Sequence, residues 1–211
     1  MSNSRIKICG LFRDEDVVAV NRALPDYVGF VFAPSTRQVT AETAQRLRAQ
    51  LDERIIAVGV FVEEAPERIV EMYACGLFAA AQLHGTYQPE QIHALRELCG
   101  ANLTIIRAVA LDEGVKVHIP LTPVPLTPSI PDEVDFPLFD YRQPGSGRRF
   151  DWRLLAGIER PYFLAGGIGL GNLSEALALN PYCIDVSSGA ETDGIKDSSK
   201  IKELVERVRR A

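Results

Sequence analysis

Short apolar runs alternate with amphipathic stretches along most of the chain. The apolar runs predict eight strands, at 5–9, 27–32, 55–61, 79–84, 103–109, 137–141, 162–165 and 184–186. Between most of them, apolar residues recur every three or four positions, which is the period of a helix with one buried face. Helices are expected after a turn at Gly10 (with Val17, Val18, Val20 and Leu24 on one side), at about 40–51, 66–74, 89–99, from 151 onward, and at about 172–179 and 198–209.

The alternation breaks once, between 111 and 137. This segment contains Pro120, Pro123, Pro125, Pro128, Pro131 and Pro137. Proline lacks the backbone N–H and clashes with the preceding turn of a helix, so this density excludes a long helix. We expect an irregular crossover in place of the helix after the fifth strand.

Eight strands, each but one followed by a helix, predict a (β/α)8 TIM barrel, as a single domain over residues 1–211. An open doubly wound sheet is the alternative. That fold usually has fewer strands and carries a glycine-rich phosphate loop after the first of them, where this chain has Cys9-Gly10-Leu11. The strand count and the position of the small-residue turns favour the barrel.

Composition limits the classes of partner. The formal net charge is −5 and the pI is near 5.3, which argues against nucleic acid or an anionic membrane as a ligand. No apolar run approaches the roughly 20 residues of a membrane span, and the N-terminus has no signal-peptide core. We therefore expect a cytoplasmic protein. The sequence leaves both a monomer and a homodimer open.

The four cysteines do not have the spacing of a zinc site or of a redox pair. Cys75, Cys99 and Cys183 are expected to be small buried apolar residues. The cysteines therefore predict no metal site.

Two strand ends near the C-terminus predict a phosphate site. The strand at 162–165 runs into Gly166 and Gly167, and the strand at 184–186 runs into Ser187, Ser188 and Gly189. Glycine allows the backbone to approach an anion, and the serines add hydroxyl groups. Tight turns required only for packing are the alternative. Because TIM barrels bind phosphate after strands seven and eight, two such turns in succession favour the phosphate site.

Alternation on the first strand places Lys7 and Cys9 inside the barrel, because Ile6 and Ile8 share the opposite, apolar face. Cys9 ends the strand, where active sites of barrels lie, although it is also suited to be a small core residue. A lysine one pleat below is expected to lower the pKa of the thiol. Strand eight neighbours strand one in a closed barrel, so Asp185 is expected to form a buried salt bridge with Lys7.

Further polar residues end other strands. Asp140 closes the sixth strand as a loop cap or a catalytic carboxyl, Gln82 and His84 share a face of the fourth, and Arg107 lies on the fifth. His84 is treated as a binding candidate only, since a lone histidine is more often structural. Arg37 is expected either to pair with a carboxylate in a bidentate fork or to lie in solvent.

These blocks occur together, in order, in one family. They are Lys7-Ile8-Cys9-Gly10, Gly29-Phe30-Val31-Phe32 with Ser35 and Arg37, Gln82-Leu83-His84-Gly85, Asp140 with Gly145-Ser146-Gly147 and Phe150-Asp151-Trp152, Leu164-Ala165-Gly166-Gly167, and Asp185-Val186-Ser187-Ser188-Gly189-Ala190-Glu191 ending in Gly194-Ile195-Lys196-Asp197. In this set, which spans nearly the whole chain, the sequence resembles the phosphoribosylanthranilate isomerases of tryptophan biosynthesis.

The resemblance implies an Amadori rearrangement without metal or cofactor. By position, Asp140 matches the general acid that opens the ribose ring and Cys9 matches the base that removes the C2 proton. Arg37 matches the residue that holds the anthranilate carboxylate, and the two small-residue turns match the phosphate site. The chemistry then requires a raised pKa at Asp140 and a partly ionised Cys9.

Two other readings stay open from the sequence. One is a related barrel isomerase that acts on a different aminoaldose phosphate. Enzymes that take both aminoaldoses generally have an aspartate at the end of strand one, where this chain has Cys9. The other is a phosphate-ligand binder without catalysis, which would be expected to lack the acid or the base.

Overall fold

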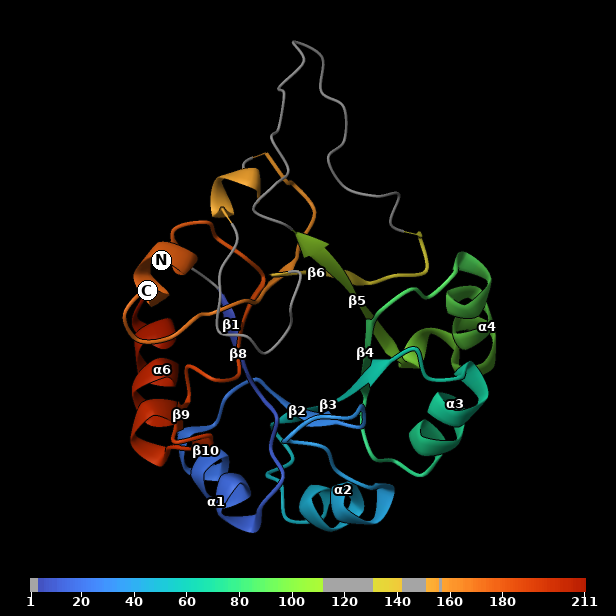
Figure 1. Ribbon diagram of the computed structural model, residues 1–211, viewed down its shortest axis with the longest axis horizontal. Coiled ribbons are helices and arrows are strands. Elements are labelled where there is room, and N and C mark those ends of the chain that lie inside the picture. The colour runs from blue at the N-terminus through green and yellow to red at the C-terminus, as the bar shows by residue number, and fades with distance from the viewer. Residues whose placement is uncertain (1–3, 112–130, 142–150, 156) are drawn as a thin grey trace.

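Eight parallel strands close into a barrel in the computed structural model (Figure 1), which describes residues 4–111, 131–141, 151–155 and 157–211. Strand β1 pairs with β2 on one side and with β8 on the other, which closes the ring. The strands are β1 (Arg5–Cys9), β2 (Tyr27–Val31), β3 (Ile56–Val62), β4 (Ala80–His84), β5 (Thr104–Leu111), β6 (Phe136–Tyr141), β7 (Phe163–Leu164) and β8 (Cys183–Val186).

Helices surround the barrel, as Figure 1 shows, with the C-terminal helix α6 packed against α1. They are α1 (Asp14–Ala23), α2 (Ala41–Arg48), α3 (Pro66–Ala74), α4 (Pro89–Cys99), α5 (Leu173–Leu177) and α6 (Ser198–Arg210), with short 3-10 turns η1 (Gly100–Asn102) and η2 (Trp152–Leu155). A small antiparallel hairpin, β9 (Glu191–Thr192) and β10 (Ile195–Lys196), separates β8 from α6. No helix in these described stretches is long and apolar enough to cross a membrane.

The start of α6 shows how local sequence sets an element. The side chain of Asp197 accepts hydrogen bonds from the backbone N–H groups of Ser199 and Lys200, which otherwise have no partner in the first turn. The helix then buries an apolar stripe and ends in arginines, whose charge suits the carboxyl end of a helix. This cap fixes where the β9–β10 hairpin ends.

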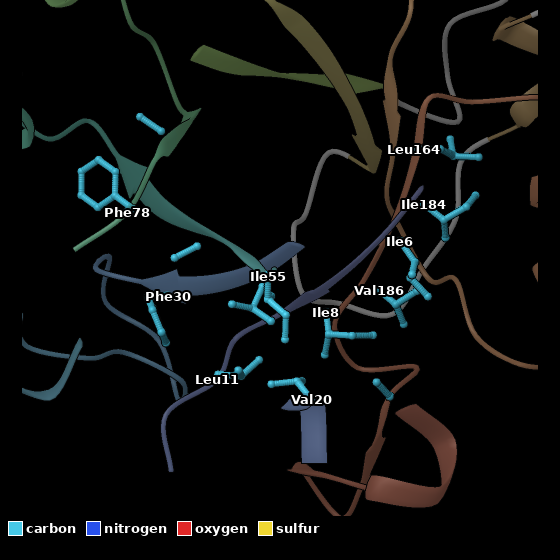
Figure 2. Packing of buried hydrophobic residues seen from close by; sticks show 14 of the residues in the cluster. Ile6, Ile8, Leu11, Val20, Phe30, Ile55, Phe78, Leu164, Ile184 and Val186 are labelled. Carbon is cyan, nitrogen blue, oxygen red and sulfur yellow. The ribbon is translucent and has the colours of Figure 1, made fainter. Parts of the chain in front are cut away.

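Two apolar layers hold the barrel. The larger lies between strands and helices, and Figure 2 shows part of it, with Ile6 and Ile8 of β1 near Ile184 and Val186 of β8. The smaller fills the barrel interior with the side chains of Tyr27, Val58, Ala80, Ile106, Leu138, Phe163, Ala165 and Cys183. Because side chains alternate along a strand, the polar residues of β1, β4, β6 and β8 lie above this inner layer, at the carboxyl ends of the strands.

The predicted strands and barrel are confirmed, and three details of the sequence reading are wrong. Within 151–155 and 157–161, the described part of the segment from Asp151, the one helical element is the 3-10 turn η2, and α5 is shorter than 172–179. Val18 is 47% exposed, because the buried face of α1 is formed by Val17, Ala19 and Val20.

Two of the cysteines also differ from expectation. Cys183 is buried inside the barrel, but Cys75 is exposed and Cys99 is half-buried, since both lie at the ends of outer helices. The predicted crossover at 111–137 falls mostly on residues 112–130, which lie outside the described residues. The block Gly145-Ser146-Gly147 lies outside them as well. At its far end the crossover is shorter than expected, because Phe136 already belongs to β6.

Candidate active site

A cavity of about 880 Å³ opens at the carboxyl ends of the strands. It is lined by most of the residues predicted from the sequence: Cys9, Arg37, Gln82, His84, Arg107, Asp140, Gly166, Gly167, Asp185, Ser187 and Ser188. Lys7 lies beneath, fully buried, and Gly189 lies in the turn after Ser188. The structure therefore brings all the predicted site residues together.

A buried polar chain forms the floor of the cavity. The Lys7 ammonium donates to Asp185 Oδ2 at 2.8 Å and to Gln82 Oε1 at 2.7 Å, and Lys7 is directly opposite Asp185 in the strand register. Burial alone would lower the pKa of Lys7, but the neighbouring Asp185 and Cys9 raise it overall. The salt bridge predicted between Lys7 and Asp185 is confirmed, and it keeps a full positive charge beneath the reacting groups.

His84 is neutral in this arrangement. Lysine has only donors, so the Gln82 atom facing Lys7 is the carbonyl oxygen, and the Gln82 amide nitrogen therefore donates to His84 Nε2 at 2.7 Å. Burial, with Lys7 and Arg107 nearby, lowers the pKa of His84 to about 4. The imidazole proton then lies on Nδ1, so His84 lines the cavity as a neutral imidazole and is excluded as a cationic anchor.

Asp140 has the properties of a general acid. It ends β6, is 9% exposed, and accepts a hydrogen bond from the backbone N–H of Tyr141 at 2.7 Å. Burial, followed by the negative charge of Asp185, raises the pKa of Asp140 to about 7. The expected upward shift is confirmed, and a large fraction of this carboxyl holds its proton at neutral pH.

Cys9 lies at the mouth as predicted, but the expected ionisation is wrong. Burial raises the pKa of the Cys9 thiol, and the lowering effect of Lys7 is smaller and is opposed by Asp185. The ammonium of Lys7 is already paired with that carboxylate, so the thiol experiences only part of its charge. Cys9 is therefore a thiol.

Arg37 forms a bidentate pair with a carboxylate of the protein. Its Nε and Nη2 atoms donate to the two carboxylate oxygens of Glu191, both at 2.6 Å. Burial favours neutral side chains, but this pairing raises the pKa of Arg37 and lowers that of Glu191. Of the two possibilities left by the sequence, the bidentate fork is correct and the solvent position is wrong.

Arg107 forms a second cationic wall. It donates to the backbone carbonyls of Leu83 and Gly85, and its guanidinium lies 5.8 Å from the ring centre of Tyr87. These contacts fix the guanidinium plane beside the cavity. Among the described residues, Lys7, Arg37, Arg107 and Lys196 place four cations around a site with two ionised carboxylates once Asp140 is protonated. The site is thus cationic in an acidic protein, which favours an anionic ligand.

The predicted phosphate turns lie side by side after β7 and β8. Gly169 and Gly189 form a parallel bridge between them, and Gly166 and Gly167 have φ angles of 91° and 62°, a region that favours glycine. The Asn172 side chain holds the first turn from both sides by hydrogen bonds to Gly169 N–H and Gly167 carbonyl.

The second turn has its carbonyls engaged away from the cavity. The Ser187 carbonyl accepts from Ala190 N–H and Lys196 Nζ, and the Ser188 carbonyl accepts from Glu191 N–H. Carbonyl oxygens repel an anion, and here they are engaged in the β9–β10 hairpin. The Ser187 hydroxyl donates to the Cys9 carbonyl at 3.3 Å, so the backbone N–H groups of this turn and the Ser188 hydroxyl remain as donors for a phosphate.

Comparison with known proteins gives a consistent result. Residues 6–207 match the family described as N-(5'phosphoribosyl)anthranilate (PRA) isomerase. An N-(5'-phosphoribosyl)anthranilate isomerase of Endomicrobium trichonymphae is 42% identical, over 97% of this chain and 98% of that protein. The chain belongs to the PRA isomerase family.

Solved structures agree. The phosphoribosyl anthranilate isomerase of Thermus thermophilus superposes with a TM-score of 0.80 at 32% identity, over 98% of both chains. A phosphoribosyl anthranilate isomerase in complex with reduced 1-(o-carboxyphenylamino)-1-deoxyribulose 5-phosphate has a TM-score of 0.76 at 28% identity, over 99% of this chain and 100% of that one.

The sequence pattern assigned no role to two buried residues beside this cavity, Glu191 and Lys196. Both lie in the β9–β10 hairpin, outside the barrel strands, so the alternation that located Lys7 and Asp185 does not apply to them. Their presence in the quoted family blocks was the one available signal.

We expect Gly189→Ala to damage the predicted phosphate turn after β8. A Cβ at this position would lie 1.9 Å from the Ile168 carbonyl oxygen and 2.8 Å from Gly169 Cα, and backbone atoms cannot move aside as side chains do. The two turns must separate, at a cost of about 1–3 kcal/mol or more in unfolding free energy. Calorimetric unfolding and titration with inorganic phosphate measure both effects.

Gly171→Ala is the matched control, because no atom lies within 4 Å of a Cβ built there. The account of the turn is wrong if Gly189→Ala binds phosphate as the wild type does.

We expect Asp185→Asn to move the pH profile of turnover to lower pH. Removing this carboxylate lowers the pKa of Asp140 and of Cys9, because in each case burial raises the pKa and Asp185 raises it further. It also removes the carboxylate that balances the charge of Lys7, which acts in the same direction on the pKa of both groups. Both limbs of the plot of kcat/KM against pH therefore shift to lower pH, whichever group each limb reports.

The control is Asp193→Asn, the same loss of charge on an exposed residue of the hairpin. An unshifted profile in Asp185→Asn would mean that this carboxylate does not set the two pKa values.

Proposed function

We propose that this protein is a phosphoribosylanthranilate isomerase that converts N-(5-phosphoribosyl)anthranilate to 1-(2-carboxyphenylamino)-1-deoxyribulose 5-phosphate, in tryptophan biosynthesis and without metal or cofactor. The observation that carries the proposal is the cavity shared by Cys9 and by a carboxyl, Asp140, whose pKa is raised to about 7. Family membership over residues 6–207 supports it.

Binding follows from the charges around the cavity. The phosphate is held by the turns at Gly166-Gly167 and Ser187-Ser188-Gly189, and the anthranilate carboxylate by Arg37. Both ends of the substrate are anionic, which matches the cationic lining. Holding both ends fixes the ribose between Cys9 and Asp140, and such positioning is itself a large contribution to rate.

The first step is ring opening. Asp140 donates its proton to the ribose ring oxygen as the bond from that oxygen to C1 breaks, and the anilino nitrogen lone pair forms the C=N bond of a protonated Schiff base. Asp140 becomes a carboxylate, and the former ring oxygen becomes a hydroxyl. A general acid in place contributes typically about 10²–10⁴-fold to such a step.

The second step is proton removal from C2. The Cys9 thiolate takes this proton, and the electrons of the C–H bond neutralise the iminium nitrogen to give an enolamine. The enolamine tautomerises to the ketone, as C1 gains a proton and the enol hydroxyl loses one. Over the cycle one proton leaves Asp140 and one arrives on Cys9, so the pair resets by returning a proton from the thiol to the carboxylate.

The decisive assay is the decay of anthranilate fluorescence with freshly generated phosphoribosylanthranilate. Wild-type activity supports the proposal. Binding of a phosphate ligand without turnover would instead favour a non-catalytic binder, and turnover of another aminoaldose phosphate alone would favour the related isomerase.

We further propose that the enzyme works in the cytoplasm, as a monomer or homodimer. All four cysteines are free, including the exposed Cys75, which is the state that a reducing compartment maintains.

A further inference from the structure

Arg37 does not act alone at its wall of the cavity. Behind it, Lys196 donates to Glu191 Oε1 at 2.5 Å, so that Glu191 bridges two cations. The side chains of Glu191 and Lys196 are 4% and 0% exposed. We call Arg37, Glu191 and Lys196 the hairpin triad, because two of its members come from β9 and β10.

Pairing with Glu191 leaves one edge of the Arg37 guanidinium available. A guanidinium has five N–H donors, which form a side-on fork from Nε and one Nη and an end-on fork from the two Nη atoms. Glu191 takes the side-on fork. Among the described residues, Nη1 of Arg37 makes no hydrogen bond, so the end-on fork is free for a second carboxylate, and Arg37 lines the cavity.

Charge explains why the pair alone would be a poor anchor. Arg37 and Glu191 together carry no net charge, and a neutral pair has little attraction for an anion. Lys196 restores one positive charge. Burial lowers the pKa of Lys196, and the carboxylate of Glu191, in hydrogen-bond contact, opposes that fall.

Lys196 also connects the triad to the phosphate turn. Besides Glu191, its ammonium donates to the Ser187 carbonyl at 3.0 Å, and Lys200 donates to the Glu191 carbonyl at 2.6 Å. The anchor for one end of the substrate and the turn that faces its other end are thus joined through one buried side chain.

The stem of Arg37 is confined as well. A Cβ on Gly10 would lie 2.6 Å from Arg37 Cδ, so the arginine passes close over the turn that follows Cys9. The guanidinium is therefore fixed at both its stem and its side-on edge.

We propose that Glu191 and Lys196 are positioning residues for the aryl carboxylate of the substrate: Glu191 orients the free fork of Arg37, and Lys196 keeps the triad cationic. This inference rests on the proposed function, because it takes the Arg37 ligand to be a benzoate-type carboxylate.

The test uses two ligands that differ by one group. They are 1-(2-carboxyphenylamino)-1-deoxyribitol 5-phosphate and the same compound without the carboxylate, each titrated calorimetrically into wild type, Glu191→Gln and Lys196→Met. The dissociation constant of the compound without the carboxylate, divided by that of the compound with it, isolates carboxylate recognition from phosphate binding. We expect each substitution to reduce the wild-type ratio by about tenfold, because the Arg37 fork then either loses its orientation or belongs to a group without net charge.

Lys202→Met is the matched control, since Lys202 pairs loosely with Glu206 on the exposed face of α6; it should keep the wild-type ratio. Lys196→Gln, which retains a donor for Glu191, serves if Lys196→Met does not fold. In steady-state kinetics, Glu191→Gln and Lys196→Met should each raise KM more than they lower kcat.

The outcomes distinguish a failure of the positioning role of Glu191 and Lys196 from a failure of the proposed function. Variants that unfold at lower temperature but keep the wild-type ratio would reduce the triad to a structural role and overturn the inference alone. A higher ratio in Glu191→Gln would overturn the orienting role, because charge without orientation would then suffice. Equal wild-type affinity for both ligands would remove the carboxylate anchor and overturn the proposed function together with the inference.

Discussion

Asp140→Asn is expected to reduce kcat by about 10³-fold or more while leaving ligand affinity within a few-fold of wild type. Asparagine has nearly the same shape and can hydrogen-bond the ribose ring oxygen, but it has no proton of suitable acidity to donate. Ring opening would then produce an alkoxide. The loss is confined to the chemical step, since the phosphate and carboxylate contacts remain.

Fluorescence decay gives kcat, and titration with the reduced product analogue gives affinity. A stability measurement is the control for folding. Burial raises the pKa of Asp140 from about 4 in the unfolded chain to about 7 in the folded protein. This carboxyl therefore lowers the free energy of unfolding as pH rises from about 4 through about 7, because the folded state resists its ionisation. Asp140→Asn should therefore unfold no more easily than wild type at pH 8. Weak binding with intact turnover would contradict the assignment of Asp140 as the acid.

Cys9→Ser is expected to lower kcat by a comparable factor. A serine hydroxyl ionises far less readily than a thiol, so the variant has almost no base to take the C2 proton. Cys9 is 8% exposed and lies against Gly29, where a Cβ would come within 2.7 Å of its sulfur, so larger replacements would confuse packing with chemistry. Serine avoids that problem.

Cys9→Ala provides the matched comparison. If Cys9 is the base, the serine and alanine variants lose turnover together and retain affinity for the reduced analogue. If Cys9 only fills space, serine should retain most of the activity. Serine with near-wild-type turnover would therefore exclude the thiolate mechanism.

Asp140 and Cys9 favour the reverse of the proton arrangement that the proposed reaction requires. The proposed reaction needs a proton on Asp140 and a thiolate at Cys9, whereas the pKa of Asp140 is about 7 and that of Cys9 is raised by burial. At a pH above the pKa of Asp140 and below that of Cys9, the pair holds one proton, mostly on the Cys9 sulfur. The active form is then a minor tautomer of the pair, and the limbs of the pH profile belong to the pair rather than to either residue.

Much of the fold and site follows from local pattern. The two-residue alternation on β1 places Lys7 and Cys9 inside, and closure of eight strands makes β8 a neighbour of β1, so the Lys7–Asp185 contact follows without coordinates. The paired turns after β7 and β8 follow from small residues at strand ends. These inferences succeed because strand periodicity and barrel closure are properties of the chain order.

The helical predictions fail where no periodic pattern constrains the chain. The Asp151 carboxylate accepts a hydrogen bond from Arg153 N–H, as the cap of a helix does, yet the described residues that follow, 152–155 and 157–161, form η2 rather than a longer helix. A cap satisfies backbone donors but does not supply the apolar face that lengthens a helix.

The sequence by itself determined the barrel, the inward face of each strand and the set of residues around the cavity, because all three depend on spacing along the chain. Only the tertiary structure decided the partner of Arg37, 154 residues away in a hairpin outside the barrel, and the direction of the pKa shift at Cys9. Both depend on burial and on distances between charges carried by different elements, and neither quantity is a function of spacing in the sequence.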